Sequence, residues 1–278
     1  MTDQIIVEKD AASRVGTITL NRPEKRNAIG QELLEGYLDA LEELRQDPAI
    51  LVVVTKANGP VFCAGMDLKY LREFNETYNP VFDWGRVDWP FRMMSTIIDY
   101  PKVTIAAVRG FALGAGLSTA IGHDVVVAAD DAQLGLPEVL RGSFGKGVTA
   151  HLMKQGLPLK KAIMLQLLGR NVTGEEAERI GLVTFSVPSD EVDEFALATA
   201  REVGVRHPAT LAHAKISAHL GQELPLNLSI YTDDLLASRM KRSVDPLGEV
   251  EGYLASQRGG TNRSYQRTDA TADLVTGA

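Results

Sequence analysis

The segment GFALGAGLST, residues 110–119, places three glycines within seven positions, after an apolar run typical of a β-strand. Glycines at the start of a helix leave its free backbone N–H groups, and the positive end of its dipole, open to close approach by an anion. Two ligands fit this chemistry, a nucleotide phosphate and an oxyanion that forms during a reaction.

The following residues disfavour the nucleotide. A P-loop requires Lys and then Ser or Thr after its last glycine, and no such pair follows Gly116. A dinucleotide-binding turn requires a third glycine where this sequence has Thr119, and it opens a full crossover helix. Only about seven residues separate Gly116 from the next β-like run at Asp124, so the sequence favours the oxyanion.

A thioester carbonyl becomes an oxyanion when an enolate forms, and two N–H donors aimed at its oxygen stabilise that charge. One donor is predicted at the start of the helix that follows Gly114. The second is predicted in FCAGMDLKYL (62–71), where a β-like run breaks at Ala64 and Gly65 and leaves the amide of Met66 well placed.

Chemistry at an enolate also needs a proton carrier, and Glu138 is the candidate. It follows Pro137 between apolar residues, where burial raises the pKa of a carboxyl toward general acid–base use. The alternative is a first-turn glutamate that the helix dipole favours, with Pro137 at the first helical position. The residue pattern leaves both interpretations open.

The elements that must position these groups alternate between strands and helices. Apolar runs at 14–20, 50–56, 103–110 and 124–130 indicate strands, and leucines at helical spacing indicate a helix over 30–47. This alternation predicts an α/β fold with a largely parallel sheet.

From about residue 188 the pattern becomes helical. Helices are predicted over 191–206, 208–221, 226–242 and 247–257, and Pro208, Pro225 and Pro246 mark the starts of the last three. We therefore expect an α/β core over 1–190, a helical oligomerisation region over 191–257, and a polar, disordered tail over 258–278.

The composition of the chain limits the classes of partner that we expect it to bind. The chain has 278 residues, 45% of them apolar, and 29 Lys plus Arg against 36 Asp plus Glu, which argues against nucleic acid and anionic membranes. The single cysteine, Cys63, excludes an internal disulfide and is expected to be a small buried residue. We see no secretory signal and no apolar run of about 18 residues, and we expect a cytoplasmic protein without a metal site.

The sequence resembles the enoyl-CoA hydratase/isomerase (crotonase) family over roughly residues 5–256. Five segments carry the resemblance in the family's order and spacing: LNRPEKRNAI (20–29), FCAGMDLK (62–69), GFALGAGLSTAIGHD (110–124), LGLPEVLRG (134–142) and TGEEAERIGLV (173–183). The resemblance implies a crotonase-like spiral of ββα turns with a C-terminal helical trimerisation region, assembled as a homotrimer or a dimer of trimers.

The resemblance also implies roles for individual residues. The oxyanion-hole amides would be those of Met66 and Ala115, and Glu138 would be catalytic. Coenzyme A would enter as part of the substrate, with no cofactor bound permanently. The residues then expected to bind the substrate are Lys25, Arg26, Ala28, Ala64, Gly65, Asp67, Leu68 and Gly114, with Tyr70 and Trp84 on the acyl side.

One departure from the family pattern bears on the reaction. Hydratases of the family use two glutamates, and Ser118 stands where the first of them is expected. A single carboxylate suffices for an enoyl-CoA isomerase, and the pattern also resembles one-carboxylate hydratase-lyases. A standard hydratase, a thioester or β-diketone hydrolase, and an acyl-CoA-binding protein without turnover stay as alternatives. Ser118 is either catalytic or a hydroxyl that caps a helix.

A second departure lies in GSFGKGVTAHL (142–152), where family members have a wall of the acyl pocket. Lys146 and His151 replace small or uncharged residues there. Lys146 would place a cation near the reacting centre or would be an exposed loop residue. His151 and His123 are expected to be packed residues rather than catalysts.

Overall fold

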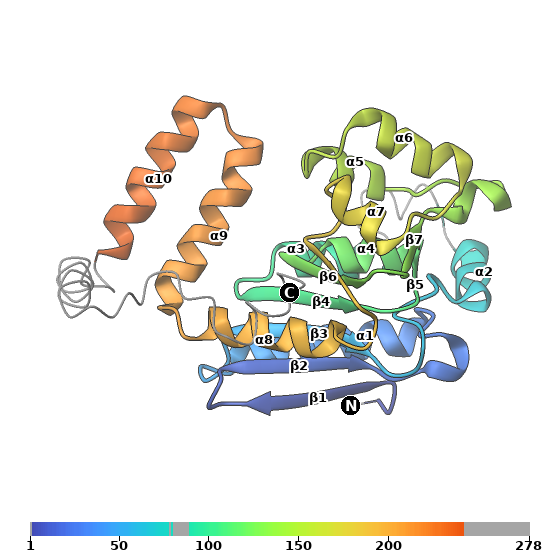
Figure 1. Cartoon of the computed structure of the whole chain (residues 1–278), viewed down its shortest axis with the longest axis horizontal. Coiled ribbons are helices and arrows are strands. Elements are labelled where there is room, and N and C mark those ends of the chain that lie inside the picture. Colours follow the sequence, from blue (N-terminus) through green and yellow to red (C-terminus); the bar gives the residue numbers. More distant parts are fainter. Residues whose placement is uncertain (1, 78, 80–88, 242–278) are drawn as a thin grey trace.

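The structure is a computed structural model that describes residues 2–77, 79 and 89–241 (Figure 1). Its elements follow in the order β1 (Ile5–Asp10), β2 (Val15–Leu20), η1 (Pro23–Lys25), α1 (Gln31–Gln46), β3 (Val52–Ala57), α2 (Leu68–Thr77), α3 (Trp89–Ile98), β4 (Val103–Val108), β5 (Phe111–Leu113), α4 (Ala115–Ile121), β6 (Val125–Ala129), β7 (Gln133–Gly135), η2 (Pro137–Arg141), α5 (Val148–Lys154), α6 (Leu159–Leu168), α7 (Gly174–Arg179), β8 (Phe185–Val187), α8 (Val192–Gly204), α9 (Pro208–Glu223) and α10 (Leu226–Met240). The η elements are short 3₁₀ helices.

The main sheet has six strands in the order β1-β2-β3-β4-β6-β8. Strand β1 is antiparallel to β2, and each of the other pairs is parallel. Every residue of β2 is buried, as are the first four of β3, which is the pattern of parallel strands covered on both faces. The predicted α/β class and largely parallel sheet are confirmed.

A second, two-stranded sheet pairs β5 with β7 in parallel, with Leu113 opposite Gly135. The chain therefore repeats a strand, a second strand and a helix twice, as β4-β5-α4 and then β6-β7-η2. Because β5 and β7 are parallel and in register, the residues after Leu113 and those after Gly135 leave the same edge. This edge brings the start of α4 beside η2.

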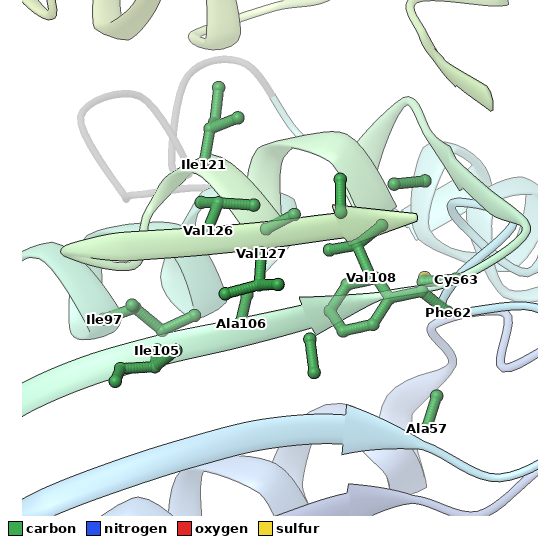
Figure 2. Close-up of a cluster of buried hydrophobic side chains, with 14 of the residues drawn as sticks. Ala57, Phe62, Cys63, Ile97, Ile105, Ala106, Val108, Ile121, Val126 and Val127 are labelled. Atoms are coloured by element: carbon green, nitrogen blue, oxygen red, sulfur yellow. The ribbon is translucent and has the colours of Figure 1, made fainter. Parts of the chain in front are cut away.

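The core lies between the sheet and its helices (Figure 2). Figure 2 shows apolar side chains of β4 and β6, such as Ile105 and Val127, among residues of the neighbouring elements, and both are fully buried. A polar contact joins three segments of the chain within this core. The Thr55 hydroxyl of β3 lies 2.8 Å from the Tyr37 hydroxyl of α1 and 2.9 Å from Nε2 of His123, which follows α4.

The C-terminal helices divide into two groups. Helix α8 packs against β2, β3, β4 and β6 and buries one face that includes Phe195. Helices α9 and α10 pack on each other, bury no residue completely, and extend away from the sheet (Figure 1). The segment over 191–257 was expected to be a helical oligomerisation region. Its first helix, α8, covers the sheet, and the chain extends away from the sheet only from α9 onward.

Candidate functional site

A pocket of about 500 Å³ opens where the start of α4, η2 and the segment before α2 meet. Backbone and apolar groups make up most of its wall. The described residues that line it are Ala64, Gly65, Met66, Leu68, Leu71, Phe74, Leu113, Gly114, Ala115, Ser118, Pro137, Glu138, Arg141, Ser143, Phe144, Lys146 and Val148.

The amide of Met66 faces this pocket because of how its neighbours pair. Ile29 N–H donates to the Gly65 carbonyl at 2.8 Å, and Asp67 N–H donates to the Ile29 carbonyl at 2.9 Å. In such a parallel bridge the central residue's own N–H points away from the partner segment. The helix α2 begins only at Leu68, so this bridge, rather than a helix start, orients the Met66 amide.

Ala115 supplies the second backbone donor. It is the first residue of α4, where an N–H has no acceptor within the helix. Its nitrogen lies close to the Met66 turn, because a Cβ built on Gly65 would be 3.8 Å from it and 2.8 Å from the Leu113 carbonyl oxygen. Two outward-facing amides therefore border the same pocket from different segments.

Glu138 lies in η2, directly after Pro137, and lines the same pocket. Its Oε2 atom is buried, and no group in the described part of the chain donates a hydrogen bond to it. Burial raises the pKa of Glu138 above its ordinary value, while its own backbone N–H and the charge of Arg141 act in the opposite direction. A carboxyl in this state is suited to carrying a proton.

Gly114 is what allows the carboxylate to sit against α4. Its φ of +55° is in the left-handed region, and a Cβ there would lie 2.7 Å from Oε1 of Glu138. Its N–H donates to the Gly135 carbonyl at 2.9 Å and so fixes β5 against β7. The glycine-rich segment thus adjoins both the Ala115 amide and the Glu138 carboxylate.

Ser118 lines the pocket but does not cap α4, so the capping hypothesis is wrong. Its hydroxyl donates to the sulfur of Met94 on α3 at 3.1 Å, and no N–H of the helix's first turn donates to it. The residue is buried. Where a second carboxylate was expected, the pocket has a small hydroxyl.

Several residues expected to bind substrate lie outside the pocket lining. Lys25 and Arg26 are exposed near η1, and Ala28 is half-buried just beyond them. Tyr70 is on α2, partly buried against the core. Trp84 lies outside the described residues, as do Pro246, the helix predicted over 247–257 and the tail over 258–278.

Asp67 is also absent from the lining. Its carboxylate oxygen Oδ2 accepts a hydrogen bond from Arg22 at 2.8 Å, and Oδ1 accepts from Lys69 N–H at 3.0 Å. Partial burial acts to raise the pKa of Asp67, but these hydrogen bonds outweigh it and the pKa is lowered. Asp67 is therefore an ionised group engaged by the protein itself.

Lys146 and His151 of the second departure, and His123, lie in different surroundings. Lys146 is an exposed loop residue, as one alternative expected, and it also lines the pocket. His151 is outside the lining, and its Nε2 donates to the Ile121 carbonyl at 3.1 Å. Burial lowers the pKa of His123 to about 4, so its ring is neutral, and Nδ1 donates to the Thr119 carbonyl at 2.9 Å. Both histidines are packed, as expected.

Sequence reasoning missed other lining residues, chiefly Arg141, Leu71 and Phe74. One signal was available for Arg141. It follows Glu138 by three positions, and side chains three apart are aligned in a 3₁₀ helix. The apolar members gave no signal, because their spacing on α2 is also that of an ordinary amphipathic helix.

The fold and the pocket define an α/β protein of the crotonase type, and comparisons with known proteins agree. A solved structure of an enoyl-CoA hydratase/isomerase (crotonase) from Legionella pneumophila superposes with a TM-score of 0.80 at 26% identity, covering 92% of this chain and 98% of that one. The sequence model of the family described as enoyl-CoA hydratase/isomerase matches residues 10–245.

Two curated relatives extend the likeness. The 2,3-dehydroadipyl-CoA hydratase of Escherichia coli (strain K12) is 32% identical over 259 residues, covering 90% of this chain and 95% of that protein. The hydroxycinnamoyl-CoA hydratase-lyase of Pseudomonas fluorescens is 32% identical over 213 residues, covering 75% and 76%. The chain belongs to the enoyl-CoA hydratase/isomerase family, and it is an acyl-CoA enzyme of that family.

Proposed function

We propose that the chain stabilises a thioester enolate with the amides of Met66 and Ala115, and that Glu138 is its single acid–base carboxylate. The observation that carries the proposal is that Glu138 lines the same pocket as Met66 and Ala115, while its buried Oε2 atom has no donor among the described residues. Among the described lining residues Glu138 is the one acid. Ser118 stands where the family resemblance leads us to expect a second glutamate.

A 3-enoyl thioester serves to write the reaction. The ionised carboxylate of Glu138 takes a proton from C2, and the electron pair of that C–H bond moves into the thioester to give a dienolate. Its charge is carried by the carbonyl oxygen, which accepts hydrogen bonds from the two amides. Glu138, now protonated, delivers the proton to C4. The double bond then lies between C2 and C3, and the carboxylate is regenerated.

Water addition is the main alternative, and the relatives' names support it. Both curated relatives described above are named as hydratases, and one of them as a hydratase-lyase. A one-carboxylate hydratase-lyase fits the same pocket if Glu138 both activates water and returns the proton. A standard hydratase would need another group to hold the water, and the Ser118 hydroxyl is the polar side chain in that position. A hydrolase and a binding protein without turnover are weaker alternatives.

Coenzyme A is proposed to enter with the substrate rather than as a resident cofactor. Its phosphates would meet Lys25 and Arg26, which are exposed beside the segment that pairs with Met66. Nucleic acid and membranes are not proposed as partners, and no helix in the described ranges is long and apolar enough to cross a membrane. A cytoplasmic location stays a prediction.

The decisive experiment incubates the protein with a trans-3-enoyl-CoA in oxygen-18 water and analyses the products by mass spectrometry. An unlabelled 2-enoyl thioester would identify an isomerase, and a labelled 3-hydroxyacyl-CoA would identify a water-adding enzyme. Labelled free acid with free coenzyme A would identify a hydrolase. Because water adds to the conjugated 2-enoyl thioester, a trans-2-enoyl-CoA is incubated in the same way. Hydration of that substrate without conversion of the 3-enoyl thioester would identify a standard hydratase. Both substrates bound but unchanged would identify a binding protein and contradict the proposal.

Glu138→Gln is the essential variant, and Glu175→Gln is its matched control. Glu175 is an exposed acid in the first turn of α7, as Glu138 is in the first turn of η2. Loss of product with the first substitution and not with the second would tie turnover to the buried carboxyl. Equal rates for the two variants would show that the Glu138 carboxyl does not take part in the reaction.

A further inference from the structure

A polar contact outside the pocket joins the two segments that present the Met66 amide. Arg22 Nη1 donates to Oδ2 of Asp67 at 2.8 Å and to the Ala28 carbonyl at 3.0 Å. The Arg22 side chain is 18% exposed and that of Asp67 is 20% exposed, so this pair is largely shielded, unlike the exposed ion pairs of α2. Shielding makes such a charge-assisted contact geometrically specific.

The segment that holds Arg22 is itself closed by hydrogen bonds. Arg22 N–H donates to the side-chain oxygen of Asn27 at 2.8 Å, and the Asn27 amide donates to the Asn58 and Val61 carbonyls at 3.0 and 2.7 Å. Asn27 is fully buried. The turn over 22–28 is therefore held in one conformation by these hydrogen bonds.

The segment that holds Asp67 is pinned on both sides of Met66. Before it, the Gly65 carbonyl accepts from Ile29 N–H, and after it, Asp67 N–H donates to the Ile29 carbonyl. Beyond that, the Asp67 side chain caps α2 through Lys69 N–H and binds Arg22 through its other oxygen. Asp67, the residue next to the proposed oxyanion donor, is thus held by three of these hydrogen bonds.

We propose that Arg22 and Asp67 are positioning residues that act as one unit to fix the direction of the Met66 amide. This inference rests on the proposed function, in which that amide binds the thioester oxygen. Neither side chain lines the pocket where the two amides and Glu138 lie. It also reassigns Asp67, which the family resemblance places among the substrate-binding residues.

The expected effect is on the charge-stabilising step rather than on binding. A donor that is misdirected by a fraction of an ångström still leaves the coenzyme A contacts intact, but it weakens the one interaction that grows as the enolate forms. We expect kcat to fall about 10- to 100-fold in Arg22→Met and in Asp67→Ser, with KM changed less than about threefold. Serine is used because it still caps a helix but cannot reach Arg22.

A spectroscopic readout separates positioning from a merely structural role. The probe is butanoyl-CoA carrying carbon-13 at its carbonyl, whose infrared stretching frequency falls when N–H groups donate to the oxygen. In the wild-type protein the bound frequency should be lower than in free solution, and in Arg22→Met and Asp67→Ser most of that decrease should be lost. Arg22→Lys, which keeps the charge and a donor, should recover part of it.

The double variant Arg22→Met/Asp67→Ser should be no worse than either single variant, since the two residues act as a unit. Arg72→Met is the matched control. It removes an exposed arginine of α2 that pairs with Glu76 of the same helix at 2.9 Å. Circular dichroism and thermal melting identify any variant that fails to fold. If Arg22→Met is such a variant, Arg22→Lys and Asp67→Ser carry the test.

The outcomes separate this inference from the proposed function. Folded variants that keep the wild-type carbonyl frequency and kcat would overturn the positioning role while leaving Glu138 chemistry intact. A frequency decrease that depends on Arg22 and Asp67, in a protein that converts no enoyl-CoA, would support the positioning role and contradict the proposed reaction. Additive losses in the double variant would contradict the single unit.

Discussion

At the residue scale, Glu138 is a carboxyl held where its charge is disfavoured. A raised pKa in the folded chain means that the folded state binds this proton more tightly than the unfolded state. The ionised form therefore costs stability at neutral pH, and this cost fades as the pH falls through the raised pKa toward the ordinary value of 4.5. Such a cost is common where a group serves chemistry rather than folding.

Glu138→Gln should therefore reduce turnover and raise stability. Removal of the proton carrier should lower kcat by at least about 100-fold. The variant should be more stable than the wild type at neutral pH, and the difference should shrink as the pH falls, which denaturant unfolding at several pH values would measure. A stability difference that does not change with pH would show that the carboxyl is not perturbed. Glu175→Gln again provides the control.

A substitution of Arg141 offers a second test of the Glu138 pKa. Its charge lowers the pKa of Glu138, so Arg141→Met should raise that pKa further. Because the base must be ionised, activity is lost as the pH falls through its pKa, and the acid limb of the kcat/KM profile should move to higher pH. Arg141 is exposed, so the movement should be larger at low salt. An unmoved acid limb, equal to that of Arg72→Met, would contradict the prediction.

Ser118→Ala separates proton transfer from water addition. The hydroxyl bonds only the weakly accepting sulfur of Met94, so its loss should change the free energy of unfolding by less than about 1 kcal/mol. Isomerisation should stay within about threefold of the wild-type rate, because Glu138 carries the proton. Any oxygen-18 incorporation should fall sharply. A large loss of isomerisation in a stable variant would instead give Ser118 a direct role in proton transfer.

At the element scale, the site depends on segments that pair only after the chain has folded. Apolar runs in the sequence predicted β2, β3, β4 and β6, and leucines at helical spacing predicted α1, whereas the edge strands β1 and β8 were not predicted. The small β5–β7 sheet was not predictable, because strands of three residues show no period. The bridge between Met66 and Ile29, which orients the Met66 amide, joins distant segments and could not be predicted from the break at Ala64 and Gly65. The contact of Asp67 with Arg22 is equally invisible to local spacing.

Gly65→Ala tests the fit between the turn before α2 and the start of α4. At a φ of +101° an alanine is strained, and its Cβ would lie 2.8 Å from the Leu113 backbone oxygen. We expect a loss of about 1–3 kcal/mol in the free energy of unfolding. Because the turn must move away from α4, the two amides separate and kcat should fall at least about tenfold, as stopped-assay kinetics would show. A stable variant with unchanged kcat would mean that the two amides do not act together.

At the scale of the whole molecule, the α9–α10 pair is fixed to the rest of the chain through α9, and α10 exposes apolar side chains. Lys215 of α9 donates to the Asp124 carboxylate at 2.8 Å and to the Lys102 carbonyl at 3.1 Å, and Lys154 of α5 pairs with Glu223. These contacts hold α9 at a defined angle to the sheet. A fixed helix pair with an exposed apolar face is expected to be covered in an assembly.

Helix α10 carries the residues that should be covered. Leu228, Tyr231 and Leu235 are three and four positions apart, so they share one face, and Tyr231 and Leu235 are 67% and 70% exposed. Burying side chains of this size is worth about 1.5–3 kcal/mol each, enough for a few of them to decide an association. We predict that the wild-type chain has three or six times the single-chain mass by light scattering.

Tyr231→Asp/Leu235→Asp should lower that mass to a single chain, because two charges would be buried without partners in any contact that uses this face. Asp233→Asn, an exposed change on the same helix, should leave the mass unchanged. Circular dichroism should be unaltered in both variants, since none of these side chains is buried within one chain. An assembly that survives the double substitution would show that α10 does not form the contact, and a single-chain mass for the wild-type protein would exclude the trimer itself.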